Sequence, residues 1–438
     1  MSPGIRHDWI AQRGEALRGR HAVPGDKSVS HRAVMLAALA DGVSSIEGFL
    51  EGEDTRATVA IFSQLGVRID APAPSHRVVH GVGIGGLQAP TGPLDCGNAG
   101  TAMRLLAGLL CGQRFDSLLA GDASLSMRPM HRVMAPLRQM GARIQSDDDQ
   151  RPPLRIGGDA RLRGIDFAPE IASAQLKSAV LLAGLYADGE TVVRESRPTR
   201  DYTERMLGEF GWPVMLEAGC VKLTGGHRLG ATDVLVPGDF SSAAFLIVAA
   251  TLVPGSDLLL ASVGVNARRT GLLHVLRTMG ADITVMQPRQ EGGEPVADLR
   301  IRYAPLTGVE VPEQHVADMI DEFPVLAIAA ACACGTTVIR GAGELRVKES
   351  DRIAAMAAGL RALGIDVEET EDGAAIEGGV LAGGEVDSHG DHRVAMAFAV
   401  AGQLARGAVV IRDVGNVATS FPGFDELVRQ AGFDLRSR

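Results

Sequence analysis

One local pattern occurs six times along the chain: a short polar cluster runs directly into an alanine-rich apolar stretch that stops at a glycine. The six stretches begin at Lys27, Asn98, Ser173, Ser241, Asp321 and Asp391. Each is apolar on every side, which predicts a helix buried all round and not an amphipathic surface helix. A helix N-terminus carries unpaired N–H groups and roughly half a positive charge, so it attracts anions. The pattern therefore indicates a chain that holds negatively charged molecules.

A second recurrence accompanies the first. The motif apolar-Gly-x-x-apolar closes a more polar helix and opens a strand, with glycines at positions 66, 141, 211, 280, 364 and 432. The successive spacings are 75, 70, 69, 84 and 68 residues. Glycine at these points fits a helix C′ cap that adopts positive φ before a strand. Ala-rich helices ending in glycine are common, but twelve ordered matches at such even spacing favour a true repeat.

The repeats group into two halves. Similar openings, PGDKSVSHR at Pro24 and PGDFSSAAF at Pro237, lie 213 residues apart, and Pro-Gly pairs are typical of crossovers. A chain of 438 residues also exceeds one ordinary core. We expect an α/β fold of two similar domains with three repeats each, one formed by residues 26–239 and the other by 1–25 plus 240–438.

Composition excludes several classes of function. The net charge of −10 argues against a general binder of nucleic acid or membrane surfaces, and aromatic residues make up only 4%. The longest apolar runs are too short to span a bilayer, and the N-terminus has no signal-peptide pattern. We expect a soluble, cytoplasmic monomer. The five cysteines show no metal-ligand spacing, and Cys332 and Cys334 are expected as buried thiols within an apolar helix.

Basic residues crowd the helix starts of the first half. Lys27 follows a glycine, but the Walker spacing is absent, so nucleoside triphosphate binding is unsupported. A lysine at a helix N-terminus opposes the dipole, which favours an anion partner over a solvated surface lysine. Arg128 follows a serine-rich turn. Ser173 could be a simple N-cap or a ligand, whereas Gln175 fits a cap poorly and could orient a hydroxyl group.

The densest charged cluster is LRVKESDR, residues 345–352. Alternating charges at a helix start are often a solvated face with weak ion pairs. Against that, Lys348 and Arg352 are spaced to share an i,i+4 helix face, beside which Glu349 could donate or accept a proton. Asp321 precedes a wholly apolar helix, where its carboxylate could be a cap or a partly desolvated general base. Arg393 adds a cation at another buried helix start.

These motifs resemble one family closely. PGDKSVSHR, CGNAGTAMR, MRPM, SAQLKSAVLLAGL, SRPTRDYTERML, MIDEFPVLAIAAA, LRVKESDRIAAM, DHRVAMAF and TSFPGF occur in the order seen in the 3-phosphoshikimate 1-carboxyvinyltransferase family, enolpyruvyl transferases of the shikimate pathway. The resemblance implies two domains, each of three βαβαββ units around buried helices. It implies transfer of the enolpyruvyl group of phosphoenolpyruvate to the 5-hydroxyl of 3-phosphoshikimate through a tetrahedral intermediate, in a cleft between the domains and without metal or cofactor.

The resemblance also implies the site residues. It gives the 3-phosphoshikimate site as Lys27, Ser28, Arg32, Ser173, Gln175, Arg200, Asp321 and Lys348. It gives the phosphoenolpyruvate site as Lys27, Gly100, Arg128, Gln175, Arg352 and Arg393. Asp321 would be the base toward the 5-hydroxyl, and Glu349, with Lys27, would handle the proton at the methylene carbon.

The chain departs from many members of that family at three points. Ala174 stands where they have a second phosphate-binding serine, and Arg200 is the expected replacement. Ala418 stands where they have a lysine, for which Thr419 is a weak substitute. Glu344 stands where some members have asparagine. Gly100 in this family leaves room for glyphosate, so the resemblance implies sensitivity to that inhibitor.

Two other functions stay open at this point: transfer to a different hydroxyl acceptor such as UDP-N-acetylglucosamine, and anion binding without catalysis. Lys27-Ser28 and the SAQLK motif speak against the first, and the presence of Asp321, Glu349 and Lys27 speaks against the second. The expected ligands are split between the halves. We therefore expect the domains to close on the substrates about crossovers near Asp26 and Asp239.

Overall fold

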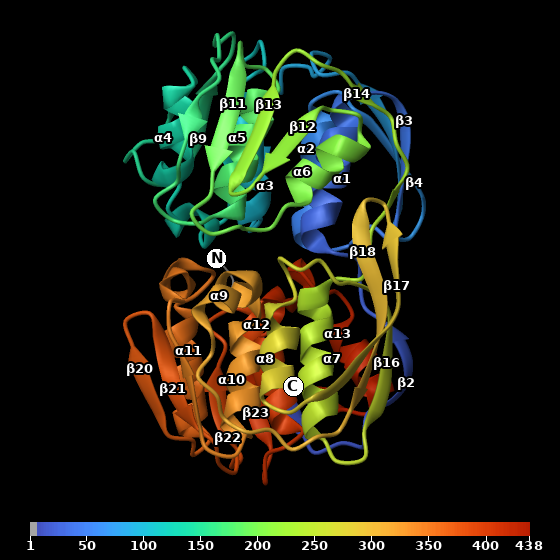
Figure 1. Cartoon of the computed structure of the whole chain (residues 1–438), viewed down its shortest axis with the longest axis vertical. Coiled ribbons are helices and arrows are strands. Elements are labelled where there is room, and N and C mark those ends of the chain that lie inside the picture. The colour runs from blue at the N-terminus through green and yellow to red at the C-terminus, as the bar shows by residue number, and fades with distance from the viewer. Residues whose placement is uncertain (1–6) are drawn as a thin grey trace. The chain divides into compact units, whose positions relative to one another are not determined.

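The computed structural model describes residues 7–438, and its contacts divide the chain into two compact units (Figure 1). Unit 1 comprises the described residues up to Pro24 together with Pro237–Gln290 and Pro295–Arg438. Unit 2 comprises Gly25–Val236 and the four-residue segment Glu291–Glu294. In each unit, buried helices lie inside and strands lie outside.

Three helices form the core of unit 2. They are α1 (Lys27–Leu39), α3 (Gly100–Leu110) and α5 (Ala174–Gly184). Nearly every side chain of α3 and α5 is buried, which confirms the expectation from their alanine- and leucine-rich sequences. More polar helices cover this core: α2 (Glu53–Gln64), α4 (His131–Gln139) and α6 (Tyr202–Glu209), with the short 3-10 helix η1 (Leu125–Met127) before α4.

The strands of unit 2 form three sheets. The first has the order β14-β3-β5-β4, with β15 also beside β3, and its strands are β3 (Ala40–Glu47), β4 (Arg68–Ala73), β5 (His76–Val82), β14 (Leu229–Gly230) and β15 (Val234–Leu235). The second is β6-β7-β9-β8, made of β6 (Leu94–Asp95), β7 (Ser117–Ala120), β8 (Arg143–Gln145) and β9 (Leu154–Gly157). The third is β10-β11-β13-β12, made of β10 (Asp166–Phe167), β11 (Glu190–Arg194), β12 (Val214–Glu217) and β13 (Cys220–Thr224).

The three sheets share one connectivity, which explains the sequence repeat. In each, a short strand runs parallel to the first long strand, as β6 does to β7, and the other pairs are antiparallel, as β7–β9 and β8–β9 are. The same arrangement joins β10, β11, β13 and β12. Each repeat therefore supplies one buried helix and one small sheet.

Unit 1 repeats this plan around α7 (Phe240–Leu252), α10 (Phe323–Ala331) and α12 (His392–Gly402). Its remaining helices are α8 (Gly271–Thr278), α9 (Glu313–Val316), α11 (Arg352–Ala362) and α13 (Phe424–Ala431), and its 3-10 helices are η2 (Ala317–Glu322), η3 (Gly343–Val347) and η4 (Gly415–Thr419). α11 begins at the last residue of the charged cluster 345–352.

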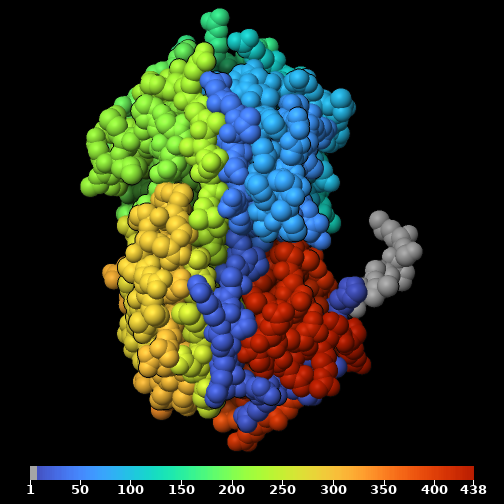
Figure 2. Space-filling view, turned by 90° about the vertical axis from the view of Figure 1, so that its right-hand side faces the viewer, coloured from blue at the N-terminus to red at the C-terminus, as the bar shows by residue number. Residues whose placement is uncertain are grey.

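The sheets of unit 1 draw on both ends of the chain. The sheet β22-β23-β1-β24 is made of β1 (Trp9–Gln12), β22 (Gly384–Asp387), β23 (Val409–Arg412) and β24 (Asp434–Ser437). The sheet β17-β18-β16-β2 is made of β2 (Arg18–Ala22), β16 (Asp257–Gly264), β17 (Asp282–Glu291) and β18 (Glu294–Arg302). The third, β19-β21-β20, is made of β19 (Thr336–Ile339), β20 (Val367–Thr370) and β21 (Gly373–Glu377). Figure 2 shows the dark blue N-terminal segment running beside the yellow and red segments that these pairings join to it.

The glycine caps are confirmed. All six glycines of the second recurrence have positive φ, between 82° and 125°, as a helix C′ residue before a strand requires. The described residues therefore bear out both recurrences, six buried helices and six helix-to-strand glycines, which confirms the expected α/β class.

One expectation about the core is wrong. Cys332 and Cys334 do not lie inside a buried helix, because α10 ends at Ala331 and Cys332 is its C-cap. Cys334 is exposed and pairs through a short bridge with Thr307, just before the turn at Gly335. The apolar run continued past the end of the helix, and the local sequence did not mark the stop. Among the residues described, no helix is both long and apolar enough to cross a bilayer.

Candidate active site

The first turn of α1 places Lys27 and Arg32 in unit 2. Asp26 caps the helix, since its Oδ1 accepts a hydrogen bond from the backbone N–H of Val29 at 2.9 Å. The ammonium of Lys27 donates to Oδ2 of Asp54 at 2.9 Å, so this lysine is not simply solvated but pairs with a carboxylate of the protein. The pair lies near the surface of the unit, with 16% of the lysine side chain exposed.

Arg32 is buried and its guanidinium is held by neutral acceptors. It donates to Thr203 Oγ1 at 2.8 Å, to the Ser28 carbonyl oxygen at 2.9 Å and to Ser178 Oγ at 2.9 Å. The pKa of Arg32 is lowered to about 10, chiefly by burial and to a smaller extent by the charge of Arg200, although the charges of Glu204, Tyr202 and Asp26 act in the opposite direction. Two arginines brought together in this way favour binding of an anion close to both.

Helices α3 and α5 are joined at their N-terminal turns by a polar pair. Arg104 donates from Nη1 to Gln175 Oε1 at 2.6 Å, and Gln175 Nε2 donates to Thr101 Oγ1 at 2.9 Å. Gln175 is therefore oriented by α3, in agreement with the expectation that it is no cap. The sequence motif contained Arg104, but its role was missed, because its partner lies 71 residues further along the chain.

Arg128 lies beside the start of α3. Its Nη2 donates to Asn98 Oδ1 at 2.5 Å, which ties the serine-rich turn to the helix start. A Cβ atom built at Gly100 would lie 3.0 Å from Arg128 Nη1 and 3.3 Å from Arg104 Nη1. The glycine thus allows two guanidinium groups to approach one helix N-terminus, which is the arrangement that an anionic ligand requires.

Ser173 is the N-cap of α5, and its hydroxyl oxygen accepts from the N–H of Leu176 at 3.4 Å. The simple interpretation of this serine is therefore confirmed. The hydroxyl oxygen is the acceptor in that bond, so the hydroxyl group can still donate its proton to a ligand. A ligand role is therefore compatible with the cap. Ala174 begins the helix, and its carbonyl oxygen accepts from Ser178 Oγ at 2.7 Å.

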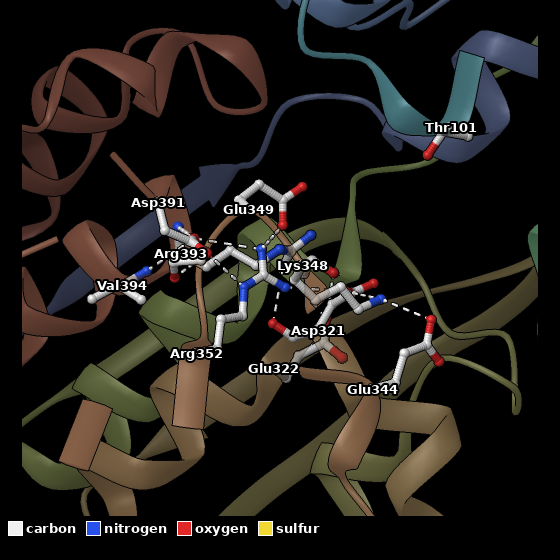
Figure 3. Close-up of polar contacts among 12 residues, drawn as sticks. Thr101, Asp321, Glu322, Glu344, Lys348, Glu349, Arg352, Asp391, Arg393 and Val394 are labelled. Carbon is white, nitrogen blue, oxygen red and sulfur yellow. Dashed lines mark hydrogen bonds and ion pairs between the residues drawn. The ribbon is translucent and has the colours of Figure 1, made fainter. Parts of the chain in front are cut away.

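In unit 1, Asp321 meets several cations at the end of η2 (Figure 3). Its Oδ1 lies 3.6 Å from Lys348 Nζ and 3.4 Å from Arg352 Nη1. Arg393 donates from Nη1 to the Asp321 backbone oxygen at 3.2 Å. The predicted residues Asp321, Lys348, Glu349, Arg352 and Arg393 are therefore brought together in one cluster.

A buried ion pair underlies this cluster. Arg352, whose side chain is 1% exposed, donates from Nε to Asp391 Oδ2 at 2.8 Å and from Nη2 to Glu349 Oε2 at 2.6 Å. Burial opposes the charged form of Arg352, yet the carboxylates of Asp391, Glu349 and Asp321 raise its pKa above the ordinary value. Burial likewise opposes ionisation of Asp391, whose pKa is nevertheless lowered by Arg352. Asp391 also caps α12, since its Oδ1 accepts from the N–H of Arg393 at 2.8 Å.

A second buried group, which the sequence did not reveal, supports Asp321. Arg269 is 3% exposed and donates to Ser241 Oγ at 2.5 Å; its Nη1 lies 3.7 Å from Glu322 Oε1 and 3.9 Å from Asp321 Oδ2. Ser241 in turn donates to Glu322, and Glu322 lies 3.8 Å from Arg393. Ser241 lies in the first turn of α7, after the Asp239 cap, so this helix start supports Asp321 through Arg269 and Glu322.

One expectation about the unit 1 cluster needs correction. Lys348 and Arg352 do not share a helix face, because Lys348 is extended and α11 begins only at Arg352 after the Asp351 cap. Both nevertheless reach Asp321. At the position where the chain departs from some members of the family, Glu344 lies 3.5 Å from Lys348 and so contacts the protein's own lysine. Thr419 is buried and donates to the Asn416 oxygen at 2.7 Å, which leaves it poorly suited to replace a lysine.

Residues 7–438 contain no group of three His, Cys, Asp or Glu side chains arranged to hold a metal ion. The ends of the buried helices instead gather arginines and lysines in both units. Fold and clusters together define a two-unit α/β protein with sites for anionic small molecules.

Comparison with known proteins gives the family. Residues 11–427 match the family model of EPSP synthase (3-phosphoshikimate 1-carboxyvinyltransferase). The chain is 66% identical over 438 residues to a 3-phosphoshikimate 1-carboxyvinyltransferase of Xanthomonas campestris pv. campestris (strain 8004), covering 100% of each chain. It is 66% identical over 431 residues to that of Xanthomonas oryzae pv. oryzae (strain PXO99A), covering 98% of each. A solved EPSP synthase from Acinetobacter baumannii superposes with a TM-score of 0.89 at 50% identity, covering 99% of this chain and 100% of that one. The chain belongs to the EPSP synthase family.

Proposed function

We propose that this protein transfers the enolpyruvyl group of phosphoenolpyruvate to the 5-hydroxyl of 3-phosphoshikimate, giving 5-enolpyruvylshikimate 3-phosphate and phosphate. The observation that carries the proposal is the family match over residues 11–427, in a chain that keeps the family's charged residues at its helix starts. The reaction is a step of aromatic amino acid biosynthesis, and both of its substrates carry a phosphate and a carboxylate.

Unit 2 would hold 3-phosphoshikimate. Its carboxylate would bind Arg32 and Ser28, and its phosphate would bind Ser173 and Arg200. The polar partners that fix Arg32 are all neutral, so the guanidinium charge is available to an incoming carboxylate. Gln175, held by Arg104, would lie against both substrates, and Lys27 would contact both as well.

Phosphoenolpyruvate would be held by arginines of both units. Arg128 and the helix start at Gly100 would supply the unit 2 contacts, and Arg352 and Arg393 the unit 1 contacts. Since guanidinium groups bind carboxylate and phosphate through two parallel hydrogen bonds, the three arginines would fix both ends of this small molecule.

The chemistry would then be an addition followed by an elimination, with three proton transfers. Asp321, with Lys348 positioning the 5-hydroxyl, would take the hydroxyl proton as the oxygen bonds to C2 of phosphoenolpyruvate. Glu349, with Lys27, would deliver a proton to the methylene carbon, which gives a tetrahedral intermediate. Removal of a proton from the resulting methyl group would expel phosphate and restore the double bond. Fixed positive charge and orientation would stabilise the intermediate.

This chemistry needs residues of both units at one substrate pair. We therefore propose that the domains 26–239 and 1–25 plus 240–438 close on the substrates, with hinges near Asp26 and Asp239. Small-angle scattering with 3-phosphoshikimate and glyphosate should show a smaller radius of gyration than the ligand-free protein. An unchanged radius would contradict closure.

The function is tested by phosphate release from phosphoenolpyruvate in the presence of 3-phosphoshikimate or of UDP-N-acetylglucosamine. Turnover with the first acceptor alone is expected. Turnover with the nucleotide sugar would show that the protein uses another hydroxyl acceptor. Turnover with neither compound would favour an anion-binding protein without catalysis. Asp321→Ala should lower kcat by at least about a hundredfold, as loss of a general base does. If Asp321→Ala stayed within a few-fold of the parent while Arg128→Ala abolished turnover, the role given to Asp321 would be wrong.

A further inference from the structure

Unit 2 contains a fully buried lysine that none of the proposed steps uses. Lys177 lies on α5, one turn after Ser173, and its side chain is 1% exposed. Its ammonium lies 2.8 Å from Glu195 Oε2 and 2.7 Å from Glu204 Oε1. A buried cation with two carboxylates is expensive to desolvate, and apolar side chains of similar volume often give equal or greater stability at such places. Stability alone therefore accounts poorly for this group.

The carboxylate of Glu195 fixes the backbone that follows it. Glu195 comes directly after β11, and its Oε1 accepts from the N–H of Thr199 at 3.1 Å and from the Thr199 hydroxyl group. Lys177 also donates to the carbonyl oxygen of Thr199 at 3.5 Å. The N–H, the carbonyl oxygen and the side chain of Thr199 are thus all tied to the Lys177–Glu195 pair.

Thr199 immediately precedes Arg200, the residue proposed to bind the phosphate of 3-phosphoshikimate. The charge of Arg200 is close enough to that of Arg32 to lower the Arg32 pKa. Two like charges repel, so a loose loop would let Arg200 move away in the absence of an anion. The bonds to Thr199 oppose that movement.

The other carboxylate serves the same region. Glu204 lies on α6 next to Thr203, whose hydroxyl oxygen accepts from Arg32 at 2.8 Å. Lys177 therefore links α5, which carries Ser173 and Gln175, to both ends of the segment 195–204. The ammonium thus contacts the backbone of Thr199, which precedes Arg200, and the carboxylate of Glu204, which follows Thr203.

We propose that Lys177, with Glu195, is a positioning residue for recognition of the 3-phosphate: it holds the Thr199 backbone so that Arg200 is in place before the substrate binds. The inference rests on the proposed function. Preorganisation of this kind raises affinity by lowering the ordering that binding requires. It acts on the phosphate of one substrate and leaves phosphoenolpyruvate and the chemical steps largely untouched.

The experiment compares binding of 3-phosphoshikimate and shikimate by calorimetry in the parent, Lys177→Met and Thr199→Val proteins. The parent should prefer the phosphorylated ligand strongly. Lys177→Met should reduce that preference by about tenfold or more, the size of a lost charge-assisted hydrogen bond, and Thr199→Val should reduce it by a few-fold. In turnover assays the KM for 3-phosphoshikimate should rise while kcat and the KM for phosphoenolpyruvate change less than about twofold.

The control is Arg194→Met. Arg194 adjoins Glu195 but forms an exposed pair with Asp166 at 2.7 Å, and its removal should leave the phosphate preference unchanged. An equal loss of affinity for shikimate and 3-phosphoshikimate in the variants would show a merely structural role and overturn the inference. If Lys177→Met does not fold, an unchanged preference in Thr199→Val overturns it. A parent that neither binds 3-phosphoshikimate nor releases phosphate would instead refute the proposed function.

Discussion

Replacing Gly108 with alanine should push helices α3 and α5 of unit 2 apart. A Cβ atom at Gly108 would lie 2.0 Å from the carbonyl oxygen of Ala179 and 2.7 Å from its carbonyl carbon, while ordinary contact begins at 3.4 Å. The backbones must therefore separate by about 1.4 Å at this point. Overpacking costs about 1–3 kcal/mol, and the helix preference of alanine offsets about 1 kcal/mol. Since the clash is with backbone, we expect a net loss of about 1–2 kcal/mol in the free energy of unfolding.

The same displacement should reach the proposed substrate contacts. Arg104 and Gln175 lie one turn before Gly108 and Ala179 on their helices, and they are joined at 2.6 Å. A separation of about 1 Å would stretch this bond beyond 3.5 Å. We therefore expect higher KM values for both substrates of Gly108→Ala, because Gln175 is proposed to contact both.

Tryptophan fluorescence can assign the stability change to one unit. The chain has two tryptophans, Trp9 in unit 1 and the buried Trp212 in unit 2. In a Trp9→Phe background, urea unfolding followed at Trp212 reports unit 2 alone. The two units then need not be fitted together as one two-state transition. Gly208→Ala on α6 is the matched control, because its new Cβ would have no neighbour within 4 Å. That change should raise the free energy of unfolding by about 0.5–1 kcal/mol. Equal midpoints for Gly108→Ala and the parent would refute the packing argument.

Three further changes test other parts of the molecule. Gly100→Ala places a Cβ 3.0 Å from Arg128 and should raise the inhibition constant of glyphosate at least about tenfold, about 1.4 kcal/mol, relative to the KM of phosphoenolpyruvate; an unchanged constant contradicts this. Arg352→Met leaves Asp391 buried without its cation and should destabilise unit 1 by about 3–5 kcal/mol, measured at Trp9 in a Trp212→Phe background; a stable variant would show that the pair is solvated. Burial lowers the pKa of His31 well below 6.5 in the folded protein. As the pH falls, His31 therefore becomes protonated in the unfolded chain before it does so in the folded protein. The resulting stability is present above pH 6.5 and declines below it by at most about 1.4 kcal/mol per pH unit, and His31→Gln should flatten this decline in urea midpoints.

Local features of the fold could be predicted from the sequence because their causes are local. A long alanine-rich run that is apolar on all sides predicts a buried helix, and a glycine that ends a helix before a strand fits positive φ, as Gly66 and Gly364 show. The end of a helix inside an apolar run could not be predicted in this way. Nothing in the run from Phe323 to Cys334 announces that α10 stops at Ala331, since tertiary packing decides it.

The predicted site residues of unit 1 meet around Asp321, but the supports of the predicted residues in both units could not be foreseen. Arg104 meets Gln175 across 71 residues of sequence, and Arg269 meets Glu322 only because α7, α8 and η2 pack together. The domain boundaries remain a prediction. Contacts group residues 25–236 with 291–294, and the second segment comes from the tip of the β17–β18 hairpin, which no sequence pattern marked.

The two units hold their arginines in opposite ways, and this bears on how anions bind. The guanidinium of Arg32 has hydroxyl and carbonyl acceptors, so burial leaves its charge uncompensated by hydrogen-bonded carboxylates and lowers its pKa. Arg352 has Asp391 and Glu349, which raise its pKa. A substrate anion at Arg32 would displace no hydrogen-bonded carboxylate, whereas one at Arg352 would compete with carboxylates already in contact. Under the proposed mechanism, the 2.6 Å contact between Arg352 and Glu349 must lengthen before Arg352 can bind phosphoenolpyruvate and Glu349 can act on a proton.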